Sequence, residues 1–247
     1  MNDSFSIGKI AKLFHVPPSK LRYWDDAGLL RFDRAPGSNY RVPSFQTMMD
    51  LCEVIFCRSI SIPTQEIKAL SAMDEAQMAA LLEKNKERLE QEAKALRAAS
   101  EKIEDKLRLL QKVRELKGKP LVLCHKKLPA LRSFSFEDEW AVEMYVHDSH
   151  KAAVRITTDG PTQFCVFLEK EAPPVLRPRD TSPQTYLYGL LRVATGDPED
   201  NNGSVFFARA KEMGYRPRDL MGRYLMTICE DKRYEYYEGF LALEAEG

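Results

Sequence analysis

The feature that most constrains the fold is the stretch from Glu75 to Lys117, which contains neither glycine nor proline. Within it, mostly apolar residues recur every seven positions or at alternating steps of four and three. They are Leu82, Leu89, Ala93, Leu96, Ser100, Ile103, Leu107 and Leu110. This heptad spacing predicts one helix of about 40 residues, roughly 60 Å long. Because such a helix cannot bury its seam alone, we expect a partner helix, and Gly118-Lys119-Pro120 is expected to end it.

The composition is that of a water-soluble chain with material for two modest cores, since 44% of its 247 residues are hydrophobic and 30% are charged. No apolar run approaches the roughly 18 residues of a membrane span, and the first residues do not resemble a secretion signal. We therefore expect a cytoplasmic protein. The five cysteines are scattered without a Cys-x-x-Cys pair, so we expect neither disulfides nor a zinc knuckle, and no cofactor.

The overall net charge of zero argues against a nucleic-acid binder, but the charge is not evenly distributed. Residues 1–41 carry a local excess of three positive charges. A weak electrostatic signal for nucleic-acid binding therefore lies at the N-terminus. The basic residues there are Lys9, Lys12, Lys20, Arg22, Arg31, Arg34 and Arg41, against Asp3, Asp25, Asp26 and Asp33.

The N-terminal pattern predicts two short helices and a wing. Ser6 is a good N-cap, and apolar residues follow it at helical spacing as far as Phe14. Pro18 suits the first position of a second helix, in which Leu21 and Trp24 share the buried face. Two short helices joined by a tight turn make a helix-turn-helix candidate. The following "RFDRAPGSNYRV" predicts a two-stranded wing.

Two further helices are predicted before the long one. Ser44 is expected to cap a third helix, and Ile62-Pro63 to begin a short fourth one that ends near Met73. The apolar positions of the third helix, which predict its buried face, are Phe45, Met48, Met49, Cys52 and Phe56.

The C-terminal part, residues 121–247, is predicted to be an α+β domain. The strand candidates are "LRSFSFE", "QFCVFLE", "TYLYGLLRV", "RYLMTICE" and "YEYYEGFLAL". A helix is expected over Ser204–Met213, a hairpin turn at "TTDGPT", and a polar loop at "TGDPEDNNG". Residues 137–153 fit helix or strand. The order of these elements suggests a duplicated unit.

The stretch "FSIGKIAKLFHVPPSKLRYWDDAGLL", followed by "SNYR", resembles the N-terminal signature of the MerR family of transcription regulators. The departures are Pro17 at the usual Ser/Thr cap, Trp24 for Tyr, Asn39 for Gly and Pro43 for an aromatic. The resemblance implies a multidomain α and α+β protein. The implied domains are a winged helix-turn-helix over residues 1–74, a dimerisation coiled coil over 75–118 and an effector-binding domain over 119–247.

The resemblance also implies the function of these parts: a homodimer with antiparallel coiled-coil pairing that binds promoter DNA and acts on RNA polymerase. Arg22 and Tyr23 would reach the major groove, and the wing would grip the flanking backbone. The alternative is that these side chains form an ordinary solvated surface. The residues implied in DNA binding are Ser19, Lys20, Arg22, Tyr23, Arg34, Asn39, Tyr40, Arg41 and Arg58.

The C-terminal part resembles the gyrase-inhibitor-like effector domain of multidrug-sensing MerR members, chiefly through "YEYYEGFLAL". Glu238 falls on the acidic position of that strand, while Phe240 stands for the commoner Tyr and Ala242 for the commoner Pro. The resemblance implies a hydrophobic, cationic ligand, because a buried carboxylate among aromatic faces suits a delocalised cation. The residues implied are Glu238, Tyr236, Tyr186, Tyr188, Tyr145, Trp140 and Phe240.

Three other interpretations stay open for the C-terminal part. Its aromatic residues also fit the core of a domain that binds no ligand, or a sensor of one metabolite. Cys124-His125 directly follows the long helix, where metal-sensing MerR members carry ligand cysteines, so a metal sensor is a further alternative. An enzyme is not expected, because the sequence has no Gly-x-Ser-x-Gly, no plausible Cys–His pair and no phosphate loop.

Overall fold

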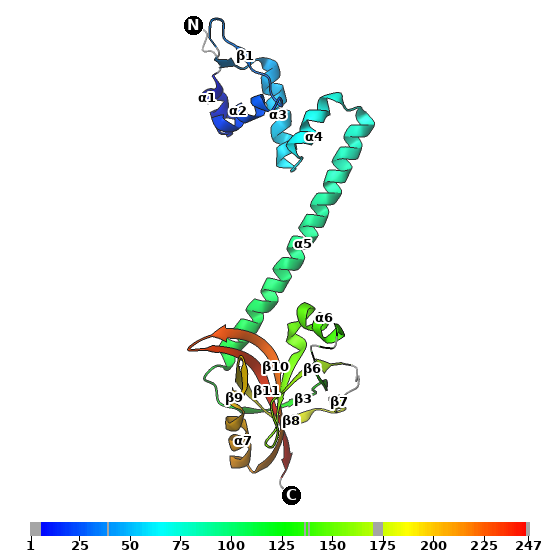
Figure 1. Ribbon diagram of the computed structural model, residues 1–247, viewed down its shortest axis with the longest axis vertical. Helices are drawn as coiled ribbons and strands as arrows, with labels where there is room; N and C mark the ends of the chain where they lie inside the picture. Colours follow the sequence, from blue (N-terminus) through cyan, green and yellow to red (C-terminus); the bar gives the residue numbers. More distant parts are fainter. Residues whose placement is uncertain (1–5, 39, 136, 138, 170–174, 246–247) are drawn as a thin grey trace. The chain divides into compact units, whose positions relative to one another are not determined.

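The structure is a computed structural model that describes residues 6–38, 40–135, 137, 139–169 and 175–245 (Figure 1). It divides into two compact units, residues 1–98 and 99–247, and the long helix contributes to both. Each unit is described by itself below.

The N-terminal unit contains the predicted helices and a small hairpin. Trp24 and Leu21 are buried in its core with Ile10 and Leu51, as the spacing predicted. Ser6 caps α1 by accepting a hydrogen bond from the Lys9 amide, and Pro18 begins α2 without a side-chain cap. The elements are α1 (Ile7–Leu13), α2 (Pro18–Asp26), β1 (Asp33–Arg34), β2 (Arg41–Val42), α3 (Phe45–Ser59), α4 (Thr64–Ala69) and the short 3-10 helix η1 (Leu70–Ala72), with β1 and β2 antiparallel.

The predicted buried face of α3 is wrong. Phe45 is 81% exposed, and Met49, Cys52 and Phe56 are exposed as well. The buried positions are instead Thr47, Leu51, Val54 and Cys57, on the opposite side of the helix. This stripe is not recognisable as apolar in the sequence, because one of its four residues is the polar Thr47. Its hydroxyl completes a capping box with Ser44 and donates to the Arg31 carbonyl oxygen, so a polar side chain is buried without an unpaired group.

The long helix α5 (Glu75–Leu116) is confirmed with nearly the predicted bounds, and Gly118 follows it with a φ of 74°. At its N-terminal end, the Asn85 amide donates to the Ile60 carbonyl oxygen at 2.7 Å. The predicted seam is unpartnered farther along, because Leu96, Ile103 and Leu107 are 71%, 61% and 59% exposed. Apolar side chains so exposed at heptad spacing are expected to be covered by another helix.

The described residues of the C-terminal unit form one antiparallel sheet of nine strands, ordered β3-β8-β11-β10-β5-β6-β4-β7 with β9 pairing β8. The predicted hairpin turn at "TTDGPT" joins β5 and β6. Its elements are β3 (Val122–Lys126), β4 (Ala130–Ser133), α6 (Glu139–His147), the 3-10 helix η2 (Ser149–Lys151), β5 (Ala152–Ile156), β6 (Gln163–Leu168), β7 (Val175–Arg177), β8 (Gln184–Ala194), β9 (Asp197–Asn201), α7 (Gly203–Glu212), β10 (Tyr215–Cys229) and β11 (Arg233–Ala245).

The sheet contains the same four-element motif twice, as the order of the predicted elements suggested. Strands β4, β5 and β6 with α6, and strands β8, β10 and β11 with α7, both follow the order strand, helix, strand, strand. In each motif the last strand pairs with the other two strands, and the two motifs join where β5 pairs with β10. The segment that the sequence left open, residues 137–153, contains the helix α6, then η2 and the first residues of β5.

The loop predicted at "TGDPEDNNG" is partly wrong, because Asp197–Asn201 form β9. The strand has no apolar pattern, and polar contacts hold it instead. The Glu199 carboxylate accepts from the Thr162 amide at 2.8 Å, and the Asn202 side chain bonds the Arg192 amide of β8 at 2.7 Å.

The two faces of the sheet carry separate cores. Phe206 of α7 packs on one face, over Gly189 and Gly239, where an added Cβ at Gly239 would lie 2.7 Å from the Phe206 ring. Phe240 belongs to the cluster of the other face, and Val113 near the end of α5 packs against Tyr236. Neighbouring residues of β11 therefore serve different environments.

None of the helices in the described part of the chain combines the length and the apolarity that a bilayer crossing requires.

Candidate functional site

The predicted DNA-contacting residues of α2 share one exposed face. Ser19, Lys20, Arg22 and Tyr23 are exposed, whereas the core side of the helix is buried. The Arg22 Nε donates to the Pro18 carbonyl oxygen at 3.3 Å, which leaves the two terminal nitrogens of the guanidinium for another partner. The face thus presents two cations, a phenol and a hydroxyl to solvent.

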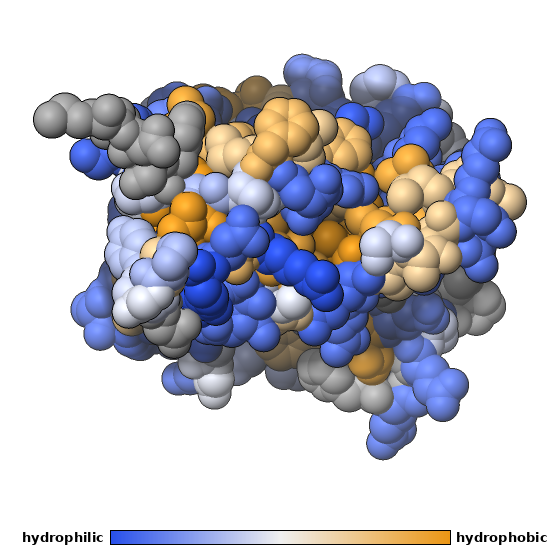
Figure 2. Space-filling view, turned by 90° about the horizontal axis from the view of Figure 1, so that it is seen from above, coloured by the Kyte–Doolittle hydropathy of each residue, from blue (hydrophilic) through white to orange (hydrophobic). Residues whose placement is uncertain are grey.

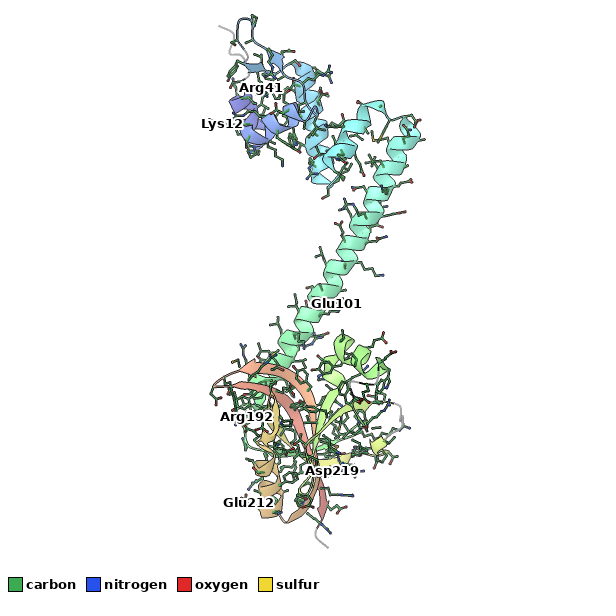
Figure 3. All side chains as sticks on the ribbon, in the orientation of Figure 1. Lys12, Arg41, Glu101, Arg192, Glu212 and Asp219 are labelled. Atoms are coloured by element: carbon green, nitrogen blue, oxygen red, sulfur yellow. The ribbon has the colours of Figure 1, made fainter. Side chains whose placement is uncertain are left out.

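The hairpin carries the next two predicted cations, and acidic residues that sequence reasoning overlooked hold both of them. The Arg41 guanidinium lies 2.5 Å from the Asp25 carboxylate and 2.6 Å from Asp26, and Arg34 reaches Asp25 at 3.2 Å. The hydrogen bond to Asp25 raises the pKa of Arg41. Figure 3 shows Arg41 in the hairpin of this unit and Lys12 on α1. The ion pairs fix the hairpin to α2, and they also neutralise part of its charge.

The remaining predicted DNA contacts differ in their surroundings. Tyr40 is exposed on the hairpin, whereas Asn39 lies outside the described residues. Arg58 donates to the Ile62 carbonyl oxygen at 2.8 Å, across a turn in which Ser61 has a φ of 63°. Arg58 thus supports the turn between α3 and α4. Figure 2 shows one face of the molecule, on which hydrophobic residues reach the surface between hydrophilic ones.

In the C-terminal unit, Glu238 is buried, with 8% of its surface exposed, and it already has partners. The Tyr188 hydroxyl donates to its Oε1 at 2.7 Å, and the Lys112 Nζ of α5 lies 3.7 Å from the same oxygen. The Lys112 ammonium also lies 5.7 Å from the centre of the Tyr188 ring. Burial, followed by the bond to Glu238, raises the pKa of Tyr188 well above its usual value, so the phenol remains a donor.

Two more predicted aromatic residues adjoin this carboxylate. The Phe240 ring centre lies 5.1 Å from that of Tyr188 and 6.2 Å from that of Tyr186, and the Lys126 ammonium lies 5.0 Å from the Phe240 ring. The fully buried Tyr186 donates its hydroxyl proton to Asp180 at 2.5 Å. Tyr186 is therefore part of a closed polar network rather than an open wall.

The other three predicted ligand residues lie elsewhere. Tyr236 packs against Val113, and its hydroxyl donates to Glu230 at 2.8 Å. The Trp140 ring lies beneath the Arg132 guanidinium at 4.2 Å. Tyr145 of α6 faces a different cavity. Four of the predicted residues thus lie together, and the other three are separate. We call Glu238, Tyr188, Phe240, Tyr186 and Lys112, which was not predicted, the Glu238 cluster.

The cavity beside Tyr145 is the feature that sequence reasoning missed. It has a volume of about 170 Å³ and lies between α6 and the sheet. Its lining includes the Tyr145, Tyr224 and Tyr237 rings and the Glu235 carboxylate, which accepts a hydrogen bond from the Tyr237 hydroxyl. Burial raises the pKa of Tyr145 and Tyr237. We call it the Glu235 cavity. The alternation of side chains along β11 is the signal that could have found this cavity, because it places Glu235 and Tyr237 together on the face opposite Glu238.

The described residues provide no cluster of metal ligands at Cys124, the residue of the metal-sensor alternative. Cys124 is half-buried in β3, and burial raises the pKa of its thiol, which disfavours the thiolate that binds metals. Within the described residues there is no group of three or more histidine, cysteine, aspartate or glutamate side chains arranged to hold a metal ion.

Comparisons with known proteins identify the N-terminal segment. Residues 6–42 match the family model described as "MerR family regulatory protein". No curated protein sequence matches the chain. Among solved structures, one titled "Cryo-EM structure of EcmrR-DNA complex in EcmrR-RPo" is 14% identical, and the alignment covers 98% of this chain and 100% of that one, with a TM-score of 0.39. A score this low carries no weight for function.

Proposed function

From its N-terminal segment, which is that of a MerR-family DNA-binding transcription regulator rather than of an enzyme, we propose that this chain is an effector-responsive activator. It binds promoter DNA as a homodimer in the cytoplasm. When a hydrophobic, cationic molecule binds the C-terminal unit, the dimer distorts the promoter spacer, and RNA polymerase then engages both promoter elements. Such deformation costs roughly 1–6 kcal/mol, which phosphate contacts offset.

The DNA-binding part is supported by the exposed face of α2 and by the hairpin beside it. Arg22 and Tyr23 are exposed on the helix that enters the major groove in helix-turn-helix proteins. Arg41 and Arg34 are held at a fixed distance from this helix by Asp25. Because the acidic partners leave each guanidinium with further donors, the wing contacts phosphates without base specificity.

The homodimer is supported by the exposed seam of α5. A single helix that exposes Leu96, Ile103 and Leu107 in a heptad pattern leaves apolar surface that a second copy would bury. A two-fold dimer reads an inverted repeat, with the half-sites in successive major grooves.

The position of Lys112 is the observation that best supports a cationic ligand. Its ammonium satisfies a buried carboxylate and lies over a tyrosine ring, which is the environment that a hydrophobic cation requires. The Glu238 cluster therefore accommodates a cation already, although that cation belongs to the protein. A ligand cation would replace it and detach the end of α5 from Glu238.

Calorimetry with tetraphenylphosphonium, ethidium and rhodamine tests this function. Glu238→Gln is expected to weaken cation binding at least tenfold, because the neutral amide keeps the shape and loses the charge. Glu235→Gln is the matched control from the neighbouring cavity and is expected to change the affinity less than about twofold. If no cation binds, the proposed ligand class is wrong. If Glu235→Gln carries the loss instead, the ligand occupies the Glu235 cavity.

Removing the internal cation is expected to have the opposite effect. In Lys112→Met the side-chain stem remains while the ammonium that competes for Glu238 is lost. Tetraphenylphosphonium should then bind about tenfold more tightly. Lys117→Met, which removes a lysine that pairs with Glu230, is the control and should leave the affinity unchanged. Equal or weaker binding by Lys112→Met would show that Lys112 does not occupy the ligand position.

A sensor of one small metabolite is the second candidate, and the size of the Glu235 cavity favours it. About 170 Å³ is below the range of roughly 300–1,000 Å³ that is usual for drug-sized ligands. Tight binding of a single neutral compound, without any response to the three cations, would support this function in place of the multidrug one.

A further inference from the structure

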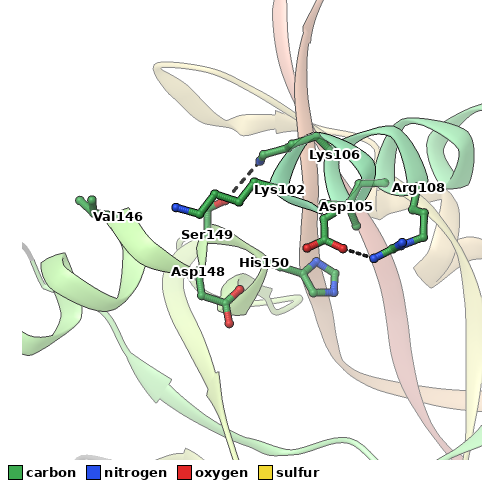
Figure 4. Close-up of a pocket in the computed structure, with 9 residues that line it drawn as sticks. Lys102, Asp105, Lys106, Arg108, Val146, Asp148, Ser149 and His150 are labelled. Atoms are coloured by element: carbon green, nitrogen blue, oxygen red, sulfur yellow. Dashed lines mark hydrogen bonds and ion pairs between the residues drawn. The ribbon is translucent and has the colours of Figure 1, made fainter. Parts of the chain in front are cut away.

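A second cavity of about 480 Å³ lies in the C-terminal unit, between the later turns of α5 and the segment that joins α6 to β5 (Figure 4). Neither the Glu238 cluster nor the Glu235 cavity contributes to its lining. The helix supplies Lys102, Lys106 and Leu109, and the opposite wall supplies Ser149 and His150. At about 100° per residue, Lys102, Lys106 and Leu109 lie on the side of α5 next to the seam residues Ile103 and Leu107.

The charges of this cavity are not balanced. Asp105 is paired with Arg108, and Asp148 with Lys151 at 3.2 Å, so both carboxylates of the lining have a cation already. Lys102 has no partner within the described part of the chain. Lys106 reaches only the neutral Ser149 hydroxyl, at 3.4 Å, and the face of the Tyr224 ring, at 5.8 Å. Two ammonium groups therefore face the cavity without a carboxylate.

The spacing of these two lysines makes the imbalance costly. Lys102 and Lys106 are four residues apart on one helix, where like charges repel one another. A bound anion would remove that repulsion and would satisfy both ammonium groups at once.

The opposite wall adds a hydroxyl donor and apolar surface. The His150 Nδ1 lies 2.9 Å from the Tyr224 carbonyl oxygen, and because a carbonyl only accepts, Nδ1 carries a proton and the imidazole is held in place by this bond. The Ser149 hydroxyl is a further donor, while Leu109 and Val146 give the cavity an apolar side.

We propose that this cavity binds a small organic anion that has a phosphate or carboxylate head and an apolar body. The head lies between the Lys102 and Lys106 ammonium groups and the Ser149 hydroxyl, and the body lies against Leu109 and Val146. The volume is within the range of small-molecule sites. The site does not depend on the proposed cation, since the other two candidate sites are centred on carboxylates. An occupant would join α5 to η2.

Calorimetry on the full chain with 1-naphthyl phosphate tests the site. We expect a Kd tighter than about 1 mM, with inorganic phosphate at least tenfold weaker and the neutral 1-naphthol not bound. The double variant Lys102→Gln, Lys106→Gln should weaken 1-naphthyl phosphate at least tenfold. Lys94→Gln, which removes one exposed charge from the same helix outside the cavity, should change the affinity less than about twofold.

Three results would overturn the proposal: no binding of 1-naphthyl phosphate, equal binding of 1-naphthol, or unchanged binding by the double variant. Lys102→Gln alone is the second test if the double variant unfolds at a lower temperature, because Lys102 makes no hydrogen bond or ion pair within the described residues that its loss would break. This single variant is expected to weaken binding several-fold, and unchanged affinity would also overturn the proposal.

Discussion

Leu96→Lys is expected to convert the proposed dimer into a monomer that no longer binds operator DNA. Leu96 lies in the middle of the heptad seam and is 71% exposed in the single chain. A lysine there would place an ammonium group inside the interface of the two helices, where it has no partner and loses its hydration. Without the dimer, only one half-site is contacted at a time, so the affinity for an inverted repeat falls by orders of magnitude.

Light scattering and gel-shift titration measure both effects. The variant should show a mass near 28.3 kDa at micromolar concentration, whereas the unchanged protein should show twice that value. Ala98→Lys is the matched control, because residue 98 lies on the opposite side of α5 from Leu96 and is also exposed. A Leu96→Lys variant that stays dimeric, or unchanged protein that is monomeric, would contradict the predicted coiled coil.

Arg22→Ala is expected to abolish specific binding while it leaves the dimer intact. Arg22 is exposed on α2, and among the described residues its side chain donates one hydrogen bond, to the Pro18 carbonyl oxygen. If Arg22 makes a bidentate contact to guanine, its loss costs about 1–3 kcal/mol at each half-site, and the proposed dimer would lose that contact twice. Binding to the operator should therefore fall to the level of unrelated DNA.

Arg41→Ala separates base contacts from backbone contacts. We expect this variant to lose the same factor on the operator and on unrelated DNA, because a wing residue that contacts phosphate carries no sequence information. The two variants are compared on both DNAs by fluorescence anisotropy. If Arg22→Ala weakens both DNAs equally, the base-reading role of Arg22 is wrong.

The N-terminal unit was predictable where one residue type dictates the local geometry. A stretch free of glycine and proline gave the bounds of α5 to within a residue, and Ser44 and Pro18 marked the beginning of their helices. The α3 face was not predictable from periodicity. Two apolar stripes at helical spacing compete there, and the buried one includes Thr47, whose hydroxyl bonds are made to the distant Arg31 carbonyl and to Ser44.

The candidate ligand site was harder to predict, because its residues are far apart along the chain. The strand alternation correctly separated Glu238 and Phe240 from Tyr237. However, Lys112 reaches Glu238 from a helix more than a hundred residues earlier, and nothing in the sequence pattern couples them. The Glu235 cavity was missed for a similar reason, since it depends on Tyr145 of α6, in a segment that the sequence left unassigned.

A footprint on the DNA upstream of the protein's own gene, made with and without tetraphenylphosphonium and at several salt concentrations, tests the central claim most directly. We predict protection of an inverted repeat within a promoter spacer, and a cation-dependent change in cleavage at its centre. The logarithm of the affinity should fall with that of the salt concentration, with a slope near 0.9 for each phosphate contacted. Protection that ignores sequence, or an affinity that barely responds to salt, would contradict the assignment as a promoter-binding regulator.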